Sequence, residues 1–298
     1  MDRVLIIGSN GMLGKDITKY FLKTKKYNVY AINRHIDDNL VKENSFVCDI
    51  SDGKALNNAL LKIKPDIIIN CAAIVNVDQC EEEKDFAFKV NSKVNEILAL
   101  YNNRKIKLIY ISTDSMFNGE KGDYSETDEV EPLNYYARTK LKGEQLILEN
   151  NKEALIVRTN IYGFHDNKEQ SSLCEWAIKN LSKNIPINGF DDVYFNPLYT
   201  KQLSQIVYEL MQLNCKGIIN VASNHYLSKY DFLIYLCDVF GFNKNLVRRS
   251  KVDNFNFKAK RPKNTTLDIK RLSSIGKYDL DIINGLKMLR DDYERSLK

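Results

Sequence analysis

The sequence predicts an α/β protein, with a doubly wound parallel sheet followed by a smaller C-terminal lobe. Three observations predict this fold: apolar runs of strand length, amphipathic helical stretches between most of these runs, and a glycine-rich turn directly after the first run. A strand buried on both faces has a continuous apolar sequence, and the helices that connect parallel strands cover both faces of the sheet. The pattern therefore predicts a parallel sheet covered by helices.

The first 160 residues contain this alternation. Apolar, β-branched runs of strand length occur at residues 4–7, 29–32, 45–48, 67–69, 108–111 and 155–157. Helix-like stretches occur at residues 11–23, 54–62, 84–101 and 135–149. We expect residues 1–160 to form the first domain.

After Arg158 the pattern is looser. Helices are expected at residues 172–181, 201–213, 229–240 and 283–296, and one further strand at residues 217–221. A chain of 298 residues with 44% hydrophobic content can form one large domain with a smaller lobe. We expect residues 161–298 to form mainly a substrate-binding lobe, part of which returns to the sheet.

Composition excludes several classes of protein. The formal charge of +5 is spread over 44 basic and 39 acidic residues, which indicates mild attraction to small anions and no nucleic-acid partner. No run approaches the roughly 20 apolar residues of a membrane span, so no membrane partner is expected. The N-terminus enters the first strand without a basic leader and cleavage site, so we expect a cytoplasmic protein.

The cysteines and histidines form no pattern typical of a metal site. The six cysteines are widely scattered without a C-x-x-C pair, and there are only three histidines. We expect free thiols in a reducing compartment and no metal ion.

A glycine turn follows the first strand, with Gly8, Ser9, Asn10, Gly11, Met12, Leu13 and Gly14 in sequence. Glycines let the backbone approach a pyrophosphate, and the free N–H groups at a helix N-terminus favour its negative charge. The spacing is G-x-x-G-x-x-G rather than the tighter G-x-G-x-x-G. The turn favours a dinucleotide site in a Rossmann-type domain over an ordinary tight turn.

Later strand ends carry further candidates for cofactor binding. Arg34 stands where the tight fingerprint has an acidic residue, so it could hold a 2′-phosphate and favour NADP, or be an exposed loop arginine. Asp49 could accept from an adenine amino group while Ile50 covers the ring, or Asp49 could cap the next helix. The small residues Ala72 and Ala73 after the fourth strand leave room for a flat ligand.

The catalytic candidates are Thr113, after the fifth strand, and Tyr136 and Lys140 in a helical context. Tyr136 and Lys140 are four residues apart and share one helix face, whereas Tyr135 points away from the lysine. A nearby ammonium and an oxidised nicotinamide ring favour the phenolate of a tyrosine and bring its pKa towards the working range. A Y-x-x-x-K pair alone is common on helix surfaces, and the glycine turn and Thr113 make the catalytic interpretation the stronger one.

With these residues the chain resembles the extended short-chain dehydrogenase/reductases, and most closely the dTDP-4-dehydrorhamnose reductase family. Further segments that carry the resemblance are residues 70–73, 77–81, 90–91, 112–114, 117–119, 131–134, 157–159, 261–264 and 267–268. The resemblance implies that NAD(P)H, with NADP(H) slightly preferred, reduces the C4 ketone of a nucleotide-linked 4-keto-6-deoxy sugar. Tyr136 would then give the proton, Lys140 would hold the nicotinamide ribose, and Thr113 would bind the keto oxygen.

The resemblance also implies the residues that line the two ligands. Asn10 to Leu13, Asp49 with Ile50, and the segment Ala73, Ile74 and Val75 should line the cofactor. Asp114, Asn160, Ile161 and Arg261 should lie on the substrate side, where a guanidinium can grip a diphosphate. The alternative for Arg261 is a solvated basic loop.

Two departures from the family, Ser115 and Ile161, stand where aromatic residues are common on the substrate side, which leaves the identity of the sugar open. Some members of the family use magnesium at a dimer interface, but no ligand set matches here. Two rival functions stay open: a nucleotide-sugar epimerase of the same superfamily, and a non-catalytic regulatory subunit like the β subunit of methionine adenosyltransferase. The sequence also leaves open whether the protein forms a homodimer.

Overall fold

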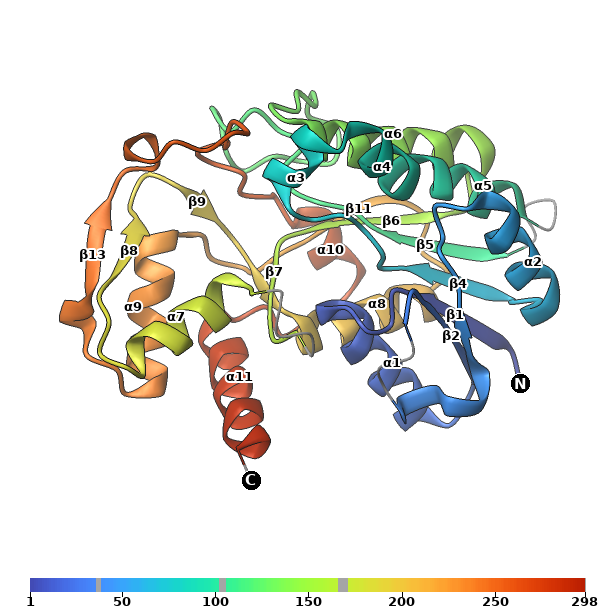
Figure 1. Ribbon diagram of the computed structural model, residues 1–298, viewed down its shortest axis with the longest axis horizontal. Coiled ribbons are helices and arrows are strands. Elements are labelled where there is room, and N and C mark those ends of the chain that lie inside the picture. Colours follow the sequence, from blue (N-terminus) through green and yellow to red (C-terminus); the bar gives the residue numbers. More distant parts are fainter. Residues whose placement is uncertain (36–38, 102–105, 166–170, 298) are drawn as a thin grey trace.

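Seven parallel strands form the central sheet of the protein, seen in a computed structural model that describes residues 1–35, 39–101, 106–165 and 171–297 (Figure 1). Across the sheet they are β11 (Gly217–Val221), β6 (Leu155–Thr159), β5 (Lys107–Ile111), β4 (Ile67–Asn70), β1 (Arg3–Ile7), β2 (Asn28–Asn33) and β3 (Ser45–Val47). All seven predicted strands are confirmed, although β3 ends one residue earlier than expected. Because the strand order reverses between β1 and β4, a crevice opens at their carboxyl ends, where doubly wound sheets bind ligands.

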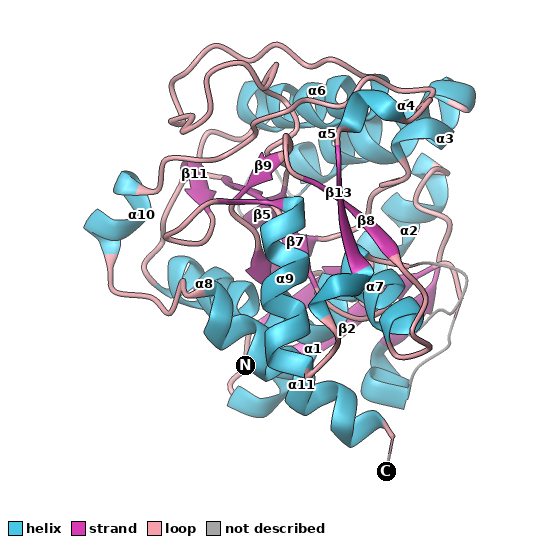
Figure 2. Cartoon of the chain, turned by 90° about the vertical axis from the view of Figure 1, so that its left-hand side faces the viewer, coloured by secondary structure: helices cyan, strands magenta, loops and turns pink. Residues whose placement is uncertain are grey.

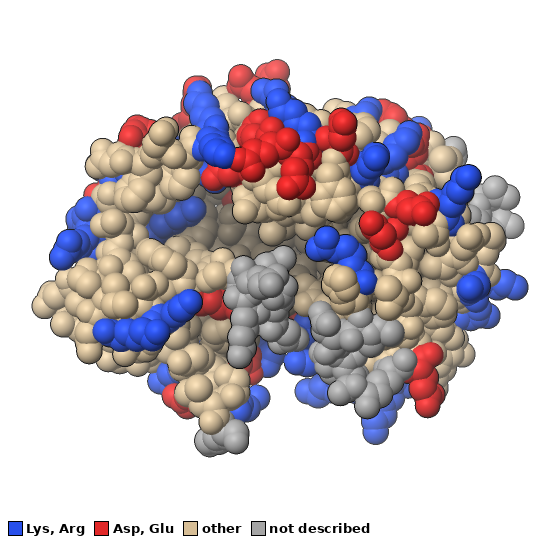
Figure 3. Space-filling view, viewed as in Figure 1, with Lys and Arg blue, Asp and Glu red and all other residues tan. Residues whose placement is uncertain are grey.

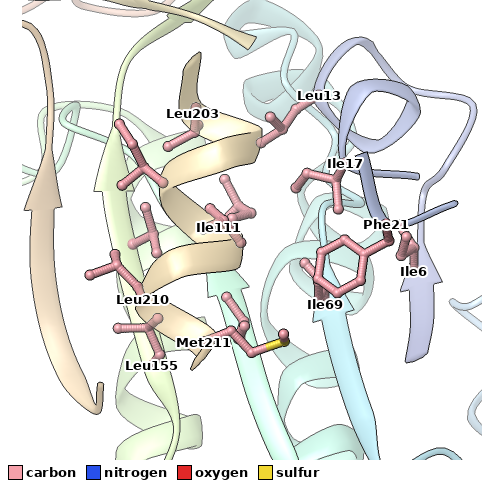
Figure 4. Close-up of a cluster of buried hydrophobic side chains, with 14 of the residues drawn as sticks. Ile6, Leu13, Ile17, Phe21, Ile69, Ile111, Leu155, Leu203, Leu210 and Met211 are labelled. Atoms are coloured by element: carbon pink, nitrogen blue, oxygen red, sulfur yellow. The ribbon is translucent and has the colours of Figure 1, made fainter. Parts of the chain in front are cut away.

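The two faces of the sheet are covered by different helices. One face packs against α1 (Met12–Thr24) and α8 (Thr200–Gln212), and the other against α2 (Gly53–Ile63), α5 (Val94–Leu100) and α6 (Tyr135–Asn150). Figure 1 shows α5 and α6 above the sheet and α1 and α8 below it. Strand β1 has side chains on both faces of the sheet. Ile6 packs in the cluster with Ile17 and Phe21 of α1 (Figure 4). Leu5 packs on the other face in the cluster that contains Leu56 of α2.

The predicted helix at residues 84–101 is correct in position but not continuous. It consists of α4 (Lys84–Phe88), a π-helical turn (Lys89–Lys93) and α5, and it follows the short helix α3 (Val77–Glu82), which the sequence pattern did not predict. The π turn contains one residue more than an α-helical turn, and such turns are frequent at functional sites. Asn91 in this turn and Asn95 in α5 are both completely buried; the Asn91 amide donates to Thr139 of α6, and the Asn95 side-chain oxygen accepts from Asn70 of β4.

The C-terminal lobe packs around its own core of Phe232, Leu236, Leu286 and neighbouring side chains. It contains α7 (Leu173–Leu181), α9 (Lys229–Phe240), α11 (Ile282–Ser296) and the parallel pair β8 (Ile187–Phe190) and β13 (Val247–Ser250), which face the viewer in Figure 2. The predicted helices are confirmed. Strands β8 and β13 were not predicted, because an edge strand with outward-facing arginines lacks a continuous apolar run.

Short elements connect the lobe to the sheet. They are β7 (Ile161–Tyr162), which pairs with β10 (Leu198–Tyr199), β9 (Tyr194–Phe195), which pairs with β12 (Leu227–Ser228), and α10 (Lys270–Ile275). The segment from α8 to β11 returns to the first domain, where β11 extends the sheet beside β6. Across the described ranges, no helix has both the length and the apolar character that crossing a membrane requires. All six cysteines are free.

A buried ion pair joins helix α6 to strand β6. Arg158 donates from Nε and Nη2 to the carboxylate of Glu144, with an Nη2 to Oε2 distance of 2.7 Å, and both side chains are almost completely inaccessible to solvent. The guanidinium also lies 5.6 Å from the ring centre of Phe117. The pair therefore ties the helix that carries Tyr136 and Lys140 to the sheet.

Replacing Glu144 by Ala is expected to lower the free energy of unfolding by about 3–5 kcal/mol, because it leaves the buried guanidinium of Arg158 without a counter-charge. The measurement is urea denaturation followed by circular dichroism. Glu149→Ala, on an exposed position of the same helix, is the matched control and should change the free energy of unfolding by less than about 0.5 kcal/mol. Equal effects of the two substitutions would contradict the role of the ion pair.

Candidate active site

The glycine turn between β1 and α1 has the geometry of a close backbone approach. Gly8 has a φ of +79°, and its N–H donates to the carbonyl of Ile32 at 2.9 Å. A Cβ atom at Gly14 would lie 2.0 Å from the carbonyl oxygen of Gly8, so only glycine fits there. Helix α1 starts at Met12 with Gly11 as its N-cap, and no side chain caps its first N–H groups. The turn thus presents free backbone donors to the crevice.

Asn33, at the end of β2, holds this turn in place. Its side-chain oxygen accepts from the Asn10 N–H at 3.0 Å, and its amide donates to Ser9 Oγ at 2.7 Å. The Asn10 side chain in turn donates to the carbonyl of His35. Sequence reasoning did not select Asn33, although its place at the end of the second strand, next to the selected Arg34, was the signal available.

Arg34, Asp49 and Ile50 lie together beyond β2 and β3. Arg34 is exposed, and it adds to the lowering of the Asp49 pKa, which comes mainly from hydrogen bonds to Ser51. Asp49 does not cap α2, because Asp52 does so by accepting from the N–H groups of Lys54 and Ala55. The Asp49 carboxylate accepts from the Ser51 N–H, while Ile50 is buried beneath it. These three predicted residues therefore share one end of the crevice.

The segment from Ala72 to Val75 follows β4 and is held by the buried Asn91. Asn91 Oδ1 accepts from the Ile74 N–H at 2.8 Å, and its amide donates to the Ile74 carbonyl and to Thr139 Oγ1 on α6. Ala72, Ala73 and Ile74 are partly exposed and Val75 is more than half exposed. Asn91 entered the sequence analysis only as part of a family segment, and the structure shows that it joins the strand end to helix α6.

Thr113, Tyr136 and Lys140 meet at the carboxyl end of β5. Helix α6 begins at Tyr135 because Asn134 caps it, accepting from the Ala137 N–H at 2.9 Å. One turn later the Lys140 ammonium donates to the Ile111 carbonyl at 2.7 Å and lies 4.1 Å from the ring centre of Tyr110. The structure therefore brings the three predicted catalytic side chains together.

The electrostatics of these groups differ from those of exposed residues. Burial raises the pKa of Tyr136, against a hydrogen bond with the Thr113 hydroxyl that lowers it. Burial lowers the pKa of Lys140 to about 7, although Glu144 and Cys71 oppose the change. The expected shift of the Tyr136 pKa towards neutrality is therefore not found in the cofactor-free protein, because burial outweighs the groups that favour the phenolate. Near neutrality Tyr136 is a protonated phenol, and Lys140 can gain or lose its proton. Perturbed titratable groups in a crevice are typical of functional sites.

Asp114 is completely buried behind Thr113, and its carboxylate is fully used by neighbours. Oδ2 accepts from Asn160 Nδ2 at 2.7 Å and from Thr265 Oγ1 at 2.5 Å, while Oδ1 accepts from Thr113 Oγ1 and Ser115 Oγ at 3.2 Å. Asp114 was predicted to lie on the substrate side, and its geometry is that of a group that orients Thr113 and Asn160. Ile161 is partly exposed in β7 beside them.

Arg261 lies in the loop between β13 and α10, close to α3. Its Nη2 donates to Asp78 Oδ2 at 3.0 Å, and Asp78 Oδ1 accepts from the Ala259 N–H. The guanidinium stands 5.0 Å from the ring centre of Phe257. Asn134 also donates to the Lys260 carbonyl, so the loop is attached to the start of α6. The Arg261 loop is thus held to α3 through Asp78 and to the start of α6 through Asn134.

The residues at the sheet edge fit a nicotinamide dinucleotide. The turn at Gly8 to Gly14 would hold its pyrophosphate, the group around Arg34 and Asp49 its adenosine, and Ala72 to Val75 with Lys140 its nicotinamide end. Figure 3 shows a hollow between the sheet and the C-terminal lobe, with Lys or Arg side chains on its wall. Within the described residues, no three His, Cys, Asp or Glu side chains are grouped to hold a metal ion. A separate cavity of about 650 Å³ lies near Lys201 and Asp292 and contains none of the predicted site residues.

The low pKa of Lys140 predicts how stability depends on pH in the cofactor-free protein. Its folded pKa of about 7 lies below its ordinary value of 10.5, so between these values the unfolded chain binds a proton that the folded chain does not. Stability contributed at this site therefore rises with pH. Relative to Lys140→Met, the wild type should gain about 2 kcal/mol in free energy of unfolding from about pH 7 to about pH 9. Urea denaturation at both pH values measures it, and a constant difference would contradict the prediction.

Comparison with known proteins places this geometry in a family. The sequence profile described as RmlD substrate binding domain matches residues 1–289. A dTDP-4-dehydrorhamnose reductase from Clostridium acetobutylicum has 30% identity and a TM-score of 0.87, covering 98% of this chain and 99% of its own. The same enzyme of Bacillus anthracis, solved in complex with NADP, has 27% identity, the same TM-score and the same coverage.

Two curated relatives show how far functions diverge among similar chains. The probable low-salt glycan biosynthesis reductase Agl14 of Haloferax volcanii is 29% identical over 89% of both chains. The methionine adenosyltransferase 2 subunit beta of Mus musculus is also 29% identical, over 92% of this chain and 82% of its own. Because the family profile spans almost the whole sequence, the protein belongs to the RmlD substrate binding domain family, and the predicted kinship with dTDP-4-dehydrorhamnose reductases is confirmed.

Proposed function

We propose that this protein is an NAD(P)H-dependent reductase that acts on the C4 ketone of a nucleotide-linked 4-keto-6-deoxy sugar. The observation that carries the proposal is the meeting of Thr113, Tyr136 and Lys140 at the same sheet edge as the glycine turn. The relatives described above as reductases, one of them with NADP bound, support the reaction class. The proposed reaction draws on the cytoplasmic pool of reduced nicotinamide cofactor.

In this proposal the side chains of the protein handle the proton and the oxygen. When bound, NAD(P)H supplies the hydride for the ketone carbon. Tyr136 donates its phenolic proton to the ketone oxygen, and its raised pKa keeps that proton in place before reaction. The Thr113 hydroxyl hydrogen-bonds the same oxygen. Lys140, when protonated, stabilises the phenolate form of Tyr136 that remains after proton transfer.

Asp114 serves this arrangement as a positioning residue. The hydroxyl of Thr113 can donate either to Asp114 or to a substrate oxygen, and the same hydroxyl accepts from the Ser115 N–H at 3.2 Å. The Thr113 oxygen is thus held between a buried carboxylate and a backbone donor. Its orientation towards Tyr136 is set before a substrate arrives, which is how sites reduce the cost of ordering groups during reaction.

A regulatory role is the second candidate, because the methionine adenosyltransferase subunit is as similar in sequence as the reductases are. A regulatory subunit would use the dinucleotide crevice for binding alone. The buried Lys140, whose pKa is lowered to about 7, favours catalysis over it, since burying an ionisable side chain is costly and such groups concentrate at reactive sites.

Tyr136→Phe is expected to lower ketone-dependent NADPH oxidation by at least about 100-fold, because it removes the proton donor. Binding of NADPH, followed by fluorescence, should be retained. The assay screens dTDP-, UDP-, GDP- and CDP-linked 4-keto-6-deoxy sugars and follows absorbance of the reduced cofactor. Tyr135→Phe, one residue away on the same helix, is the matched control and should keep wild-type activity. Full activity of Tyr136→Phe would refute the catalytic role, and no oxidation with any sugar would favour the regulatory function.

The cofactor preference follows from Arg34. If its exposed guanidinium pairs with the 2′-phosphate, Arg34→Ala should raise KM for NADPH by about ten-fold and leave KM for NADH nearly unchanged. Steady-state kinetics with both cofactors measures the two values in the same preparation, so NADH serves as the internal control. Equal kcat/KM for the two cofactors in both the wild type and Arg34→Ala would remove the basis for a preference.

A further inference from the structure

Lys229, the first residue of helix α9, is placed at the wall of the crevice by a short chain of backbone contacts. Its N–H donates to the Val193 carbonyl at 2.9 Å, and Ser228 pairs with Tyr194 of β9. Tyr194 in turn exchanges hydrogen bonds with the segment at 263–265, since its N–H donates to the Lys263 carbonyl and its carbonyl accepts from the Thr265 N–H. Thr265 is the residue that hydrogen-bonds Asp114.

The side chain of Lys229 lies within electrostatic range of two charged groups of the site, Asp114 and Arg261. It is partly buried, and its ammonium is attracted by Asp114 and repelled by Arg261, while burial lowers its pKa. In the part of the chain that the structure describes, no hydrogen bond or ion pair of this ammonium is found. Asp114 does not neutralise it by direct contact, because both carboxylate oxygens are already taken by Thr113, Ser115, Asn160 and Thr265.

Other basic side chains of the same lobe are paired and point to solvent. Lys251 lies 2.8 Å from Asp191, Lys263 lies 2.6 Å from Asp253, and Lys258 pairs with Glu82. Each of these lysines is about half exposed or more. Lys229 therefore differs from its neighbours both in burial and in having no carboxylate in contact.

The guanidinium of Arg261 also has an unsatisfied hydrogen-bond donor. Its Nη2 is paired with Asp78, but its Nη1 is buried and, within the described residues, has no hydrogen-bond partner. Lys229 and Arg261 repel each other, and two neighbouring cations are unfavourable unless an anion lies near both. An anion with two or more negative charges and several acceptor oxygens meets both needs, and a diphosphate has this chemistry.

We infer that Lys229 binds the diphosphate of the nucleotide-sugar substrate together with the free edge of Arg261. The inference rests on the proposed function for the identity of the ligand, and it assigns Lys229 a role in substrate specificity. The pyrophosphate of the dinucleotide is a second source of the same chemistry, but the glycine turn that would hold it lies on β1 and α1, in the other domain. Lys229 should therefore affect substrate binding and leave cofactor binding unchanged.

The test is calorimetric titration of the full-length protein with dTDP, and separately with NADPH. Lys229→Met keeps the length of the side chain and removes its charge, so the Kd for dTDP should rise by about ten-fold or more while the Kd for NADPH stays the same. Lys229→Arg should restore most of the affinity. Lys258→Met, a paired surface lysine of the same lobe, is the matched control and should bind dTDP as the wild type does.

The outcomes separate this inference from the proposed function. Equal dTDP affinity of the wild type and Lys229→Met, or equal loss in Lys229→Met and Lys258→Met, overturns the role of Lys229 and leaves the reductase proposal standing. The expected loss of dTDP affinity in a protein that reduces none of the sugars supports the diphosphate site while refuting the reductase. Where reduction is observed, Lys229→Met should raise KM for the sugar nucleotide by about ten-fold with kcat changed less than about three-fold.

Discussion

The close approach of helix α6 to the π turn is the constraint on which the site depends. Gly143 lies inside α6, where glycine costs about 1 kcal/mol relative to alanine. A Cβ atom there would lie 2.5 Å from the Asn91 carbonyl oxygen and 2.9 Å from the Tyr110 hydroxyl. Because Gly143 has no side chain, α6 packs directly against the buried π turn. Lys140 on the same helix can then donate to the Ile111 carbonyl at the end of β5.

Buried polar groups connect this contact to the proposed cofactor position and to the proposed substrate position. Asn91 links the strand end at Ile74 to Thr139 of α6, so the proposed nicotinamide position and the catalytic helix share one support. On the other side, Asp114 joins the end of β5 to Asn160 and to Thr265 of the lobe loop. Because the buried Asn91 amide and Asp114 carboxylate are both hydrogen-bonded to several elements, they hold the crevice rigid where the chemistry is proposed to occur.

Much of the fold could be predicted because the first domain is periodic. Most of its strands contain a continuous apolar run, and most of its connecting helices are long enough to show an amphipathic pattern, as in Met12–Thr24. The elements that were missed are short or irregular. The π turn at Lys89–Lys93 leaves the local composition helical, and β13 (Val247–Ser250) pairs with β8, a strand almost 60 residues earlier in the chain. Such pairing depends on contacts that no local pattern records.

By itself the sequence determined the parallel sheet, the glycine turn, and the pairing of Tyr136 with Lys140, because each depends on spacing along one segment. Only the tertiary structure decided what surrounds these groups. The burial that lowers the pKa of Lys140 to about 7, the hold of Asn33 on the turn, and the convergence of Lys229 and Arg261 arise where distant segments meet. Burial and electrostatic coupling depend on contacts between segments that are distant in the sequence, so they arise only when the chain has folded.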